Sequence, residues 1–332
     1  MGCHQWLYHL LSLRRLIISL QPLYRIIGRS LMAFADAMLS VYFRCCNLSK
    51  FIVHLDDNET KVYIWAAKHP KCNKPNLVLI HGFGSNSKWQ FIFQVRQLTH
   101  DFNVYIPDLV FFGESYSTKL DRSVWFQAKC VREGLKKMKV KKCSVYAISY
   151  GGFVGYQMAA AADDDEEEII LMVEKLVIVS SGIVCKHDSK LEHVNKIGRN
   201  VVDLLVAKTP EDLRMLCRMS VSKYDFTKWF PDFFLWGFID FERCKREKEE
   251  LVHELLMEKP DIDLLVVKQE TLLVWGEKDH VFPVEWAYQL HRHLGVKSKL
   301  HIIKGVGHAL NLEAPYSLNR FISTFVLGSS QK

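Results

Sequence analysis

The chain has 332 residues and a formal net charge of +7; 49% of its residues are apolar and 24% are charged. This length allows one large domain or two smaller ones with a real hydrophobic core, and the composition excludes a disordered or fibrous chain. The positive charge is mild and no basic block is interleaved with aromatic residues, so nucleic acid is not an expected partner.

The nine cysteines are scattered, without a C-x-x-C pair or the spacing of zinc ligands. They indicate reduced thiols in a cytoplasmic protein that is not secreted. His291 and His293 stand two apart on an expected helix and therefore point to different sides, which does not make a metal pair. We expect no metal and no organic cofactor.

Residues 1–50 are apolar, but arginines interrupt them, so no uncharged run reaches the roughly 18 residues of a membrane span. Apolar residues recur at spacings of three and four in two segments, which predicts two amphipathic helical stripes with a break at Pro22. The second runs from Tyr24 to Val41, with polar residues on its other side. Those polar residues are Arg25, Arg29, Asp36 and Ser40. Two interpretations stay open: a peripheral anchor that rests in a membrane surface, or two amphipathic helices that pack on the rest of the chain.

Between residues 51 and 182, short apolar runs alternate with helical segments. Phe51–Leu55 and Lys61–Trp65 are expected to form a hairpin. The buried strands that follow are expected at Asn76–Ile80, Asn103–Ile106, Lys142–Ile148 and Leu176–Gly182. Such alternation predicts a mainly parallel sheet covered by helices on both faces, with the site at the carboxyl ends of the strands. The acidic run 163–168 is expected to be a solvated loop.

The alternation stops between residues 183 and 267, where only helices are expected. They span Lys190–Ala207, Thr209–Met219, Pro231–Phe241 and Lys245–Glu258. A helical block inserted into an α/β pattern predicts a cap over the site. Its aromatic run contains Phe234 and Trp236, which we expect to line the mouth of a pocket.

The α/β pattern resumes over residues 268–332. Strands are expected at Glu270–Trp275 and Lys299–Ile303, and the polar residues Asp279 and His308 follow them closely. The chain therefore divides into a helical segment 1–50, a core made of 51–182 with 268–332, and a cap 183–267.

The stretch Val145–Val154 carries the clearest chemical signal. The end of a buried strand leads through Ala147-Ile-Ser-Tyr-Gly151 into a helix rich in small residues. This is the strand–turn–helix context of a nucleophile elbow, which holds Ser149 out of the sheet. The helix that begins there aims free N–H groups at negative charge that develops nearby.

Several motifs in this order resemble those of the α/β-hydrolase superfamily over most of residues 60–330. The motifs are His81-Gly-Phe-Gly84, Pro107-Asp-Leu-Val-Phe-Phe-Gly-Glu-Ser115, the elbow, Trp275-Gly-Glu-Lys-Asp279 and Gly307-His308-Ala-Leu-Asn-Leu-Glu-Ala-Pro315. The chain is similar to capped serine hydrolases that include monoacylglycerol lipases and meta-cleavage C–C hydrolases. Ala147 in place of glycine and Phe112 in the aspartate segment depart from the pattern, and neither removes a reacting group.

The resemblance implies a Ser–His–Asp triad, with Ser149 as nucleophile, His308 as base and Asp279 as the residue that orients the imidazole. The backbone N–H groups of Phe83 and Tyr150 are expected to form the oxyanion hole. His81 is expected near the substrate pocket, where it braces its loop. Asp108 is expected to tie down its own turn.

Three functions remain open. The first is a serine esterase or lipase that acts on a small lipid ester such as a monoacylglycerol. The second is a C–C bond hydrolase of diketone-like acids, which needs a cation in the pocket; Arg214 or Arg218 could supply it, but both are expected to be surface charges. The third is a hormone receptor that keeps the fold and turns over slowly. The sequence leaves the oligomeric state undetermined.

Overall fold

A computed structural model describes residues 2–161, 170–184, 187–223, 225–257 and 266–328, although side-chain environments are not described for the first 21 residues. Within these ranges the strands form one nine-stranded sheet in the order β1-β2-β4-β3-β6-β7-β8-β9, with β5 paired to β2. The expected acidic loop at 163–168 lies outside the described residues.

The sheet begins as a hairpin and continues in parallel. β1 pairs with β2 antiparallel, and β2 also pairs antiparallel with β4 and with the short β5. From β4 through β9 all neighbours are parallel. The strands are β1 Leu48–Leu55, β2 Thr60–Ala67, β3 Asn76–Ile80, β4 Asn103–Pro107, β5 Tyr116–Ser117, β6 Lys142–Ile148, β7 Met172–Val179, β8 Glu270–Gly276 and β9 Ser298–Ile303. The predicted mainly parallel sheet is therefore correct.

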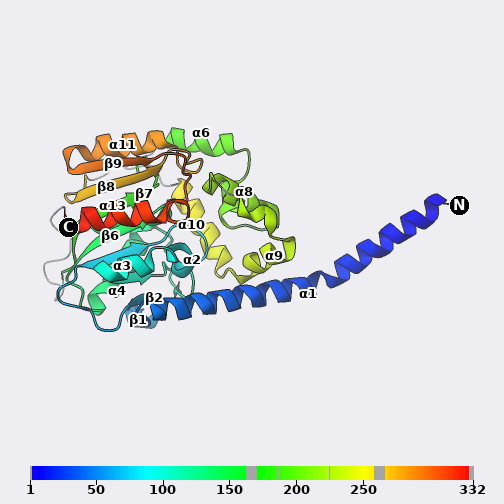
Figure 1. The fold of residues 1–332 in the computed structure, drawn as a ribbon, viewed down its shortest axis with the longest axis horizontal. Coiled ribbons are helices and arrows are strands. Elements are labelled where there is room, and N and C mark those ends of the chain that lie inside the picture. Colours follow the sequence, from blue (N-terminus) through cyan, green and yellow to red (C-terminus); the bar gives the residue numbers. More distant parts are fainter. Residues whose placement is uncertain (1, 162–169, 185–186, 224, 258–265, 329–332) are drawn as a thin grey trace.

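Helices cover both faces of this sheet (Figure 1). The helices on one face are α2 Ser87–Phe91, α3 Val95–Asp101, α12 Leu310–Glu313, α13 Pro315–Leu327 and the C-terminal end of α1. The helices on the other face are α4 Val124–Lys137, α5 Tyr150–Ala160 and α11 Val284–Leu294. Each face has its own apolar cluster, because the strands are buried on both sides.

Between β7 and β8 the described residues contain helices and no strand. These helices are α6 His187–Ile197, α7 Val201–Leu205, α8 Pro210–Ser220, α9 Asp232–Phe241 and α10 Lys245–Met257. α8 begins with a capping box formed by Thr209 and Asp212, with Pro210 in the first turn. Leu213, Leu235 and Ile239 form a small apolar cluster that holds α8 and α9 together.

The N-terminal helix differs from the expectation. α1 is one helix, Gly2–Cys45, with Pro22 inside it, so the predicted break at Pro22 is wrong. A proline removes one hydrogen bond, and a helix can continue with a kink when its other bonds persist. α1 runs beneath α9 and projects far beyond the body of the protein (Figure 1). Among the described residues, Pro22–Cys45 is long and apolar enough to cross a membrane by length and composition alone.

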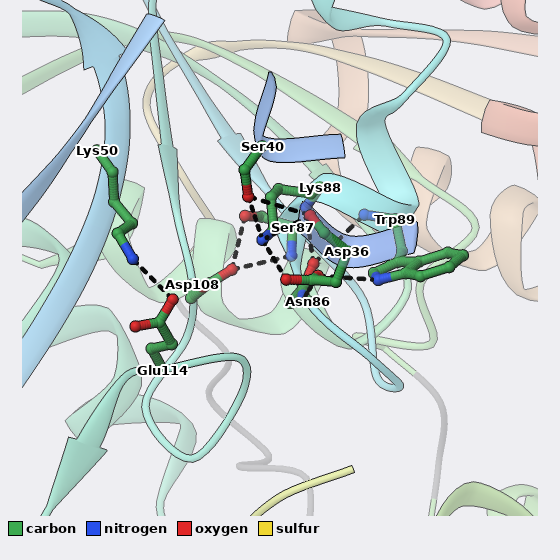
Figure 2. A network of polar contacts seen from close by, with 9 residues as sticks. All are labelled: Asp36, Ser40, Lys50, Asn86, Ser87, Lys88, Trp89, Asp108 and Glu114. Atoms are coloured by element: carbon green, nitrogen blue, oxygen red, sulfur yellow. Dashed lines mark hydrogen bonds and ion pairs between the residues drawn. The ribbon is translucent and has the colours of Figure 1, made fainter. Parts of the chain in front are cut away.

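The apolar stripe of α1 faces away from the protein. Its exposed members are Leu23, Tyr24, Ile27, Leu31, Phe34, Met38 and Val41. The inward side carries the buried Met32, Leu39 and Phe43 together with the polar residues that the sequence placed opposite the stripe. Asp36 pairs with Lys88 at 2.6 Å, and it also accepts hydrogen bonds from Asn86 and Trp89 (Figure 2). The polar side of α1 is thus the side that fastens it to the α/β body.

Candidate active site

Ser149 stands where β6 meets α5. Its backbone has φ 56° and ψ −124°, a conformation that non-glycine residues rarely adopt. Such strain persists only where the surroundings enforce it, and active-site turns are one place where it is found. Tyr150 is the first residue of α5, so its N–H group lies at the helix N-terminus, where N–H groups have no partner within the helix.

Close packing beneath the turn requires small residues. A Cβ atom added to Gly151 would lie 2.4 Å from the carbonyl oxygen of His81, and one added to Gly155 would lie 2.7 Å from the Cβ of Ala147. The methyl group of Ala147, which replaces the glycine of the usual motif, therefore fits because Gly155 opposite it has no side chain.

Two loops at the carboxyl ends of β8 and β9 bring an acid and a histidine to this serine. His308 Nε2 lies 2.9 Å from Ser149 Oγ, and His308 Nδ1 lies 2.9 Å from Asp279 Oδ2. The other Asp279 oxygen accepts hydrogen bonds from the N–H groups of Val281 and Phe282, at 2.9 and 2.8 Å. The Asp279 side chain is fully buried, and that of His308 is 10% exposed.

These contacts fix the tautomer of His308. A carboxylate only accepts hydrogen bonds, so Nδ1 carries the proton that bonds to Asp279. Nε2 is then left to accept the proton of the Ser149 hydroxyl. The structure therefore brings together the three residues that the sequence proposed as nucleophile, base and orienting acid.

The loop 82–84 lies directly against Ser149, because a Cβ on Gly82 would be 2.8 Å from the serine Cβ. Gln90 holds this loop: its side chain accepts from the Gly82 N–H group at 2.8 Å and donates to the carbonyls of Gly82 and Gly84 at 3.0 and 2.7 Å. The Phe83 ring packs edge-on against Phe112 and Tyr150. No motif in the sequence points to Gln90, because its role depends on how closely α2 follows the loop.

The family model "Alpha/beta hydrolase family" matches residues 77–319, a range that contains all of these residues. The chain belongs to the alpha/beta hydrolase family. It is also 32% identical over 113 residues to an uncharacterized protein of Mycobacterium tuberculosis, a match that covers 34% of this chain and 30% of that relative.

Solved structures share the fold of this hydrolase-family chain. A membrane phospholipase A described as a bacterial virulence factor matches with TM-score 0.73 and 21% identity, over 99% of this chain and 100% of that one. An esterase from Exiguobacterium antarcticum matches with TM-score 0.65 and 18% identity, over 84% and 100%. A 2-hydroxy-6-oxo-6-phenylhexa-2,4-dienoate hydrolase from Rhodococcus sp. strain RHA1 matches with TM-score 0.65 and 17% identity, over 85% and 100%.

Two cavities of this α/β hydrolase meet at Ser149. The larger, about 510 Å³, lies between the body and the helices α8 and α9, and both Ser149 and His308 line it. The smaller, about 100 Å³, extends toward α6, α7 and α11, and Ser149 lines it as well. Both walls are mainly apolar, with rings from Phe230, Phe234 and Phe238 on the larger one and from Phe153, Phe282 and Trp286 on the smaller one.

Only one of the three predicted pocket residues lies in these walls. Phe234 lines the larger cavity and stacks on Phe230 at 4.5 Å. Trp236, two residues further along α9, instead lies under the guanidinium of Arg25, 4.6 Å from its ring centre. Residues two apart on a helix point about 200° apart, so they cannot share one wall.

His81 braces its loop from behind rather than lining a cavity. Its Nε2 accepts from the Leu109 N–H group at 2.9 Å, so Nδ1 donates to the Gly82 carbonyl at 2.7 Å. Burial lowers the pKa of His81 to about 4, so the ring stays neutral near pH 7. Asp108 accepts two hydrogen bonds from Ser87 and ties its turn to the start of α2 (Figure 2).

Arg214 and Arg218 supply no cation to the two cavities at Ser149, in agreement with the expectation that they are surface charges. Arg214 pairs with Asp232 and Arg218 with Glu211, and neither lines either of these two cavities. Lys245 and Lys248 line the larger cavity instead. No pattern in the sequence singled them out, because they belong to the highly charged start of α10.

Proposed function

We propose that this α/β hydrolase is a serine hydrolase that cleaves the carboxylic ester of a small lipid of the monoacylglycerol type. The observation that carries the proposal is the hydrogen bond of 2.9 Å between Ser149 Oγ and His308 Nε2, formed where the two apolar cavities meet. A serine hydroxyl becomes a useful nucleophile only when a base takes its proton.

In the proposed mechanism, Ser149 Oγ attacks the ester carbonyl carbon while its proton passes to His308 Nε2. Asp279 stabilises the imidazolium through its hydrogen bond to Nδ1. The N–H groups of Phe83 and Tyr150 receive the carbonyl oxygen as it becomes negative; one such donor contributes roughly 3 to 4 kcal/mol in a well-studied protease. His308 then protonates the leaving alcohol, and a water activated by the same base cleaves the acyl-enzyme.

The substrate class rests on the cavities. We propose that residues 183–267 act as a cap whose helices α8 and α9 hold an apolar chain against the body. Apolar lining residues from these helices support this, because each buried CH₂ group contributes about 0.8 kcal/mol. With 510 Å³ the larger cavity has the size of ordinary small-molecule sites.

We also propose that α1 rests on or in a membrane. Its outward stripe of exposed apolar residues supports this, since a large exposed apolar patch marks a surface that another apolar phase covers. Arg25 bonds to Asp240 at 2.6 Å, so this charge already has a partner. The contribution of Arg25 to the salt dependence of membrane binding should therefore be small.

A fluorophosphonate probe tests the catalytic assignment. We expect it to label Ser149 in the wild type, and Ser149→Ala to lose both the label and, by several orders of magnitude, the kcat for esters. Ser180→Ala is the matched control, because Ser180 also follows a strand with positive φ but has no histidine partner among the described contacts. Labelling of another serine in the wild type would rule out the assignment.

One observation favours a second candidate, the C–C bond hydrolase. Such a substrate carries a carboxylate, and the larger cavity contains lysines. A panel of neutral esters and vinylogous diketone acids on purified protein separates the two. Fast turnover of the diketone acids with slow turnover of every ester would replace the ester proposal.

A further inference from the structure

Charged residues occupy one part of the otherwise apolar larger cavity. Glu242, Lys245 and Lys248 line it together with Ser149 and His308. They come from the connection between α9 and α10 and from the first turn of α10, which begins at Lys245. An apolar cavity with a few convergent charges is the usual form of a site that orients an amphiphilic ligand.

The nearby carboxylates already have partners. Lys248 is 3% exposed, forms an ion pair with Glu242, and lies 4.8 Å from the centre of the Phe112 ring. Asp240 accepts two hydrogen bonds from Arg25, at 2.6 and 2.5 Å. Lys245 forms no hydrogen bond or ion pair within the part of the chain that the structure describes. The cluster therefore keeps one positive charge without a direct partner.

This lysine costs stability where it stands. Burial lowers the pKa of Lys245, which means that the folded protein solvates the ammonium poorly. The attraction of Asp240 and Glu242 offsets this only in part, and repulsion by Arg25 and Lys248 adds to it. The first turn of a helix is also the end at which a cation is unfavourable. Lys245 is therefore unfavourable both as a partly buried cation and as a cation in the first turn of a helix. Residues that are unfavourable for local stability in this way are expected at functional positions.

We propose that Lys245 is an anion-binding subsite of the larger cavity, and that the substrate carries a carboxylate or phosphate group in addition to its ester. A bound anion would give the Lys245 ammonium the direct partner that it lacks among the described residues. The resulting charge-assisted hydrogen bond is stronger than a neutral one. The bond that is cleaved stays the same. The assignment of a substrate rests on the proposed function, whereas the binding of an anion does not.

Matched esters test the subsite. The first pair is 1-acylglycerol 3-phosphate against 1-acylglycerol with the same acyl chain, and the second is dodecyl hydrogen succinate against dodecyl butanoate. We expect Lys245→Met to lower kcat/KM for the anionic member of at least one pair by about tenfold or more, and to leave the neutral member nearly unchanged. Lys245→Arg should keep most of the preference, because it keeps the charge.

Arg243→Met is the matched control, since Arg243 is exposed two residues earlier and does not line the cavity. It removes one positive charge from the same region and should leave the anionic preference intact. Unfolding of Lys245→Met should occur at the wild-type temperature or above it, because the lost ammonium is half-buried and lacks a partner.

A binding measurement separates this proposal from the ester hydrolysis. Dodecyl phosphate and dodecanoate cannot be hydrolysed by the proposed reaction, and Trp89 in the cavity wall provides a fluorescence signal. Tighter binding of either anion than of dodecanol, lost in Lys245→Met and kept in Arg243→Met, supports the subsite even if no ester is turned over. The two compounds also distinguish phosphate from carboxylate.

Three outcomes would overturn the subsite. The first is equal loss of kcat/KM for the charged and the neutral esters in Lys245→Met. The second is unchanged binding of both dodecyl anions in that variant. A lower unfolding temperature together with an unchanged anionic preference would assign Lys245 to the charge balance of the cap instead.

Discussion

At the scale of single residues, Phe234 and Trp236 differ in what they contact although both belong to α9. Phe234 lies in the wall of the larger cavity, while Trp236 lies under Arg25. An apolar chain in that cavity can therefore gain contact with one ring and not with the other. This makes Trp236 a matched control for Phe234.

We expect kcat/KM to rise along a monoacylglycerol chain-length series and to level off where the cavity ends, because buried CH₂ groups help only while there is room. Phe234→Ala should flatten the rise and leave short acetate esters nearly unaffected. Trp236→Ala should keep the wild-type profile. The measurement is kcat/KM across the series for all three proteins, and equal flattening by both variants would exclude the proposed wall.

At the scale of elements, the crossing of α1 over α9 depends on two glycines. A Cβ on Gly28 would lie 2.2 Å from the Phe233 carbonyl oxygen, and one on Gly237 would lie 2.2 Å from the backbone of Gly28. The hydrogen bond from Arg25 to Asp240 joins the same two helices. Met32, one helical turn after Gly28, lines the larger cavity. The N-terminal helix thus contributes to the wall of the larger cavity.

Gly28→Ala distinguishes this crossing from simple helix propensity. In an isolated helix the change stabilises by about 1 kcal/mol, but here the new methyl group meets backbone, and overpacking costs roughly 1 to 3 kcal/mol. We therefore expect a lower unfolding temperature and altered kcat/KM for long esters. Ala37→Val, exposed on the same helix, is the control. A stabilised Gly28→Ala protein would mean that α1 and α9 do not pack this closely.

At the scale of the whole molecule, α1 places its apolar stripe outside and its polar residues inside. The arrangement leaves Phe34 65% exposed and Ile27 42% exposed. Meanwhile Asp36, Ser40 and Lys88 form hydrogen bonds at the α/β body (Figure 2). A helix whose polar side meets the protein has its apolar side available for lipid.

Flotation with phospholipid vesicles tests this orientation on the full-length chain. Ile27→Glu and Phe34→Glu should each reduce the floating fraction severalfold, because a charge on the face that enters the lipid opposes insertion. Val296→Glu is the control, since Val296 is fully exposed and belongs to the short connection between α11 and β9. Figure 1 shows α11 and β9 on the side of the body opposite to α1. If both α1 variants float to the same extent as the wild type, another surface of the protein binds the vesicles.

The sequence by itself determined the longer strands, although not the two-residue β5, and it also determined the elbow and the order of the site segments. These are local properties: apolar runs of strand length, the small residues around Ser149, and polar residues just after the strands that became β8 and β9. It also anticipated the helical insertion between β7 and β8. Each of these follows from the periodicity and bulk of neighbouring side chains, which do not depend on distant parts of the chain.

Only the tertiary structure decided which way these elements face. Ser149 and His308 are 159 residues apart, and their contact at 2.9 Å exists because parallel strands end at the same edge. The partners of Trp236, the place of Lys245 in the cavity wall and the outward stripe of α1 depend on which surfaces meet. A helical pattern fixes which residues share a face, but the packing of distant segments selects the face that is buried.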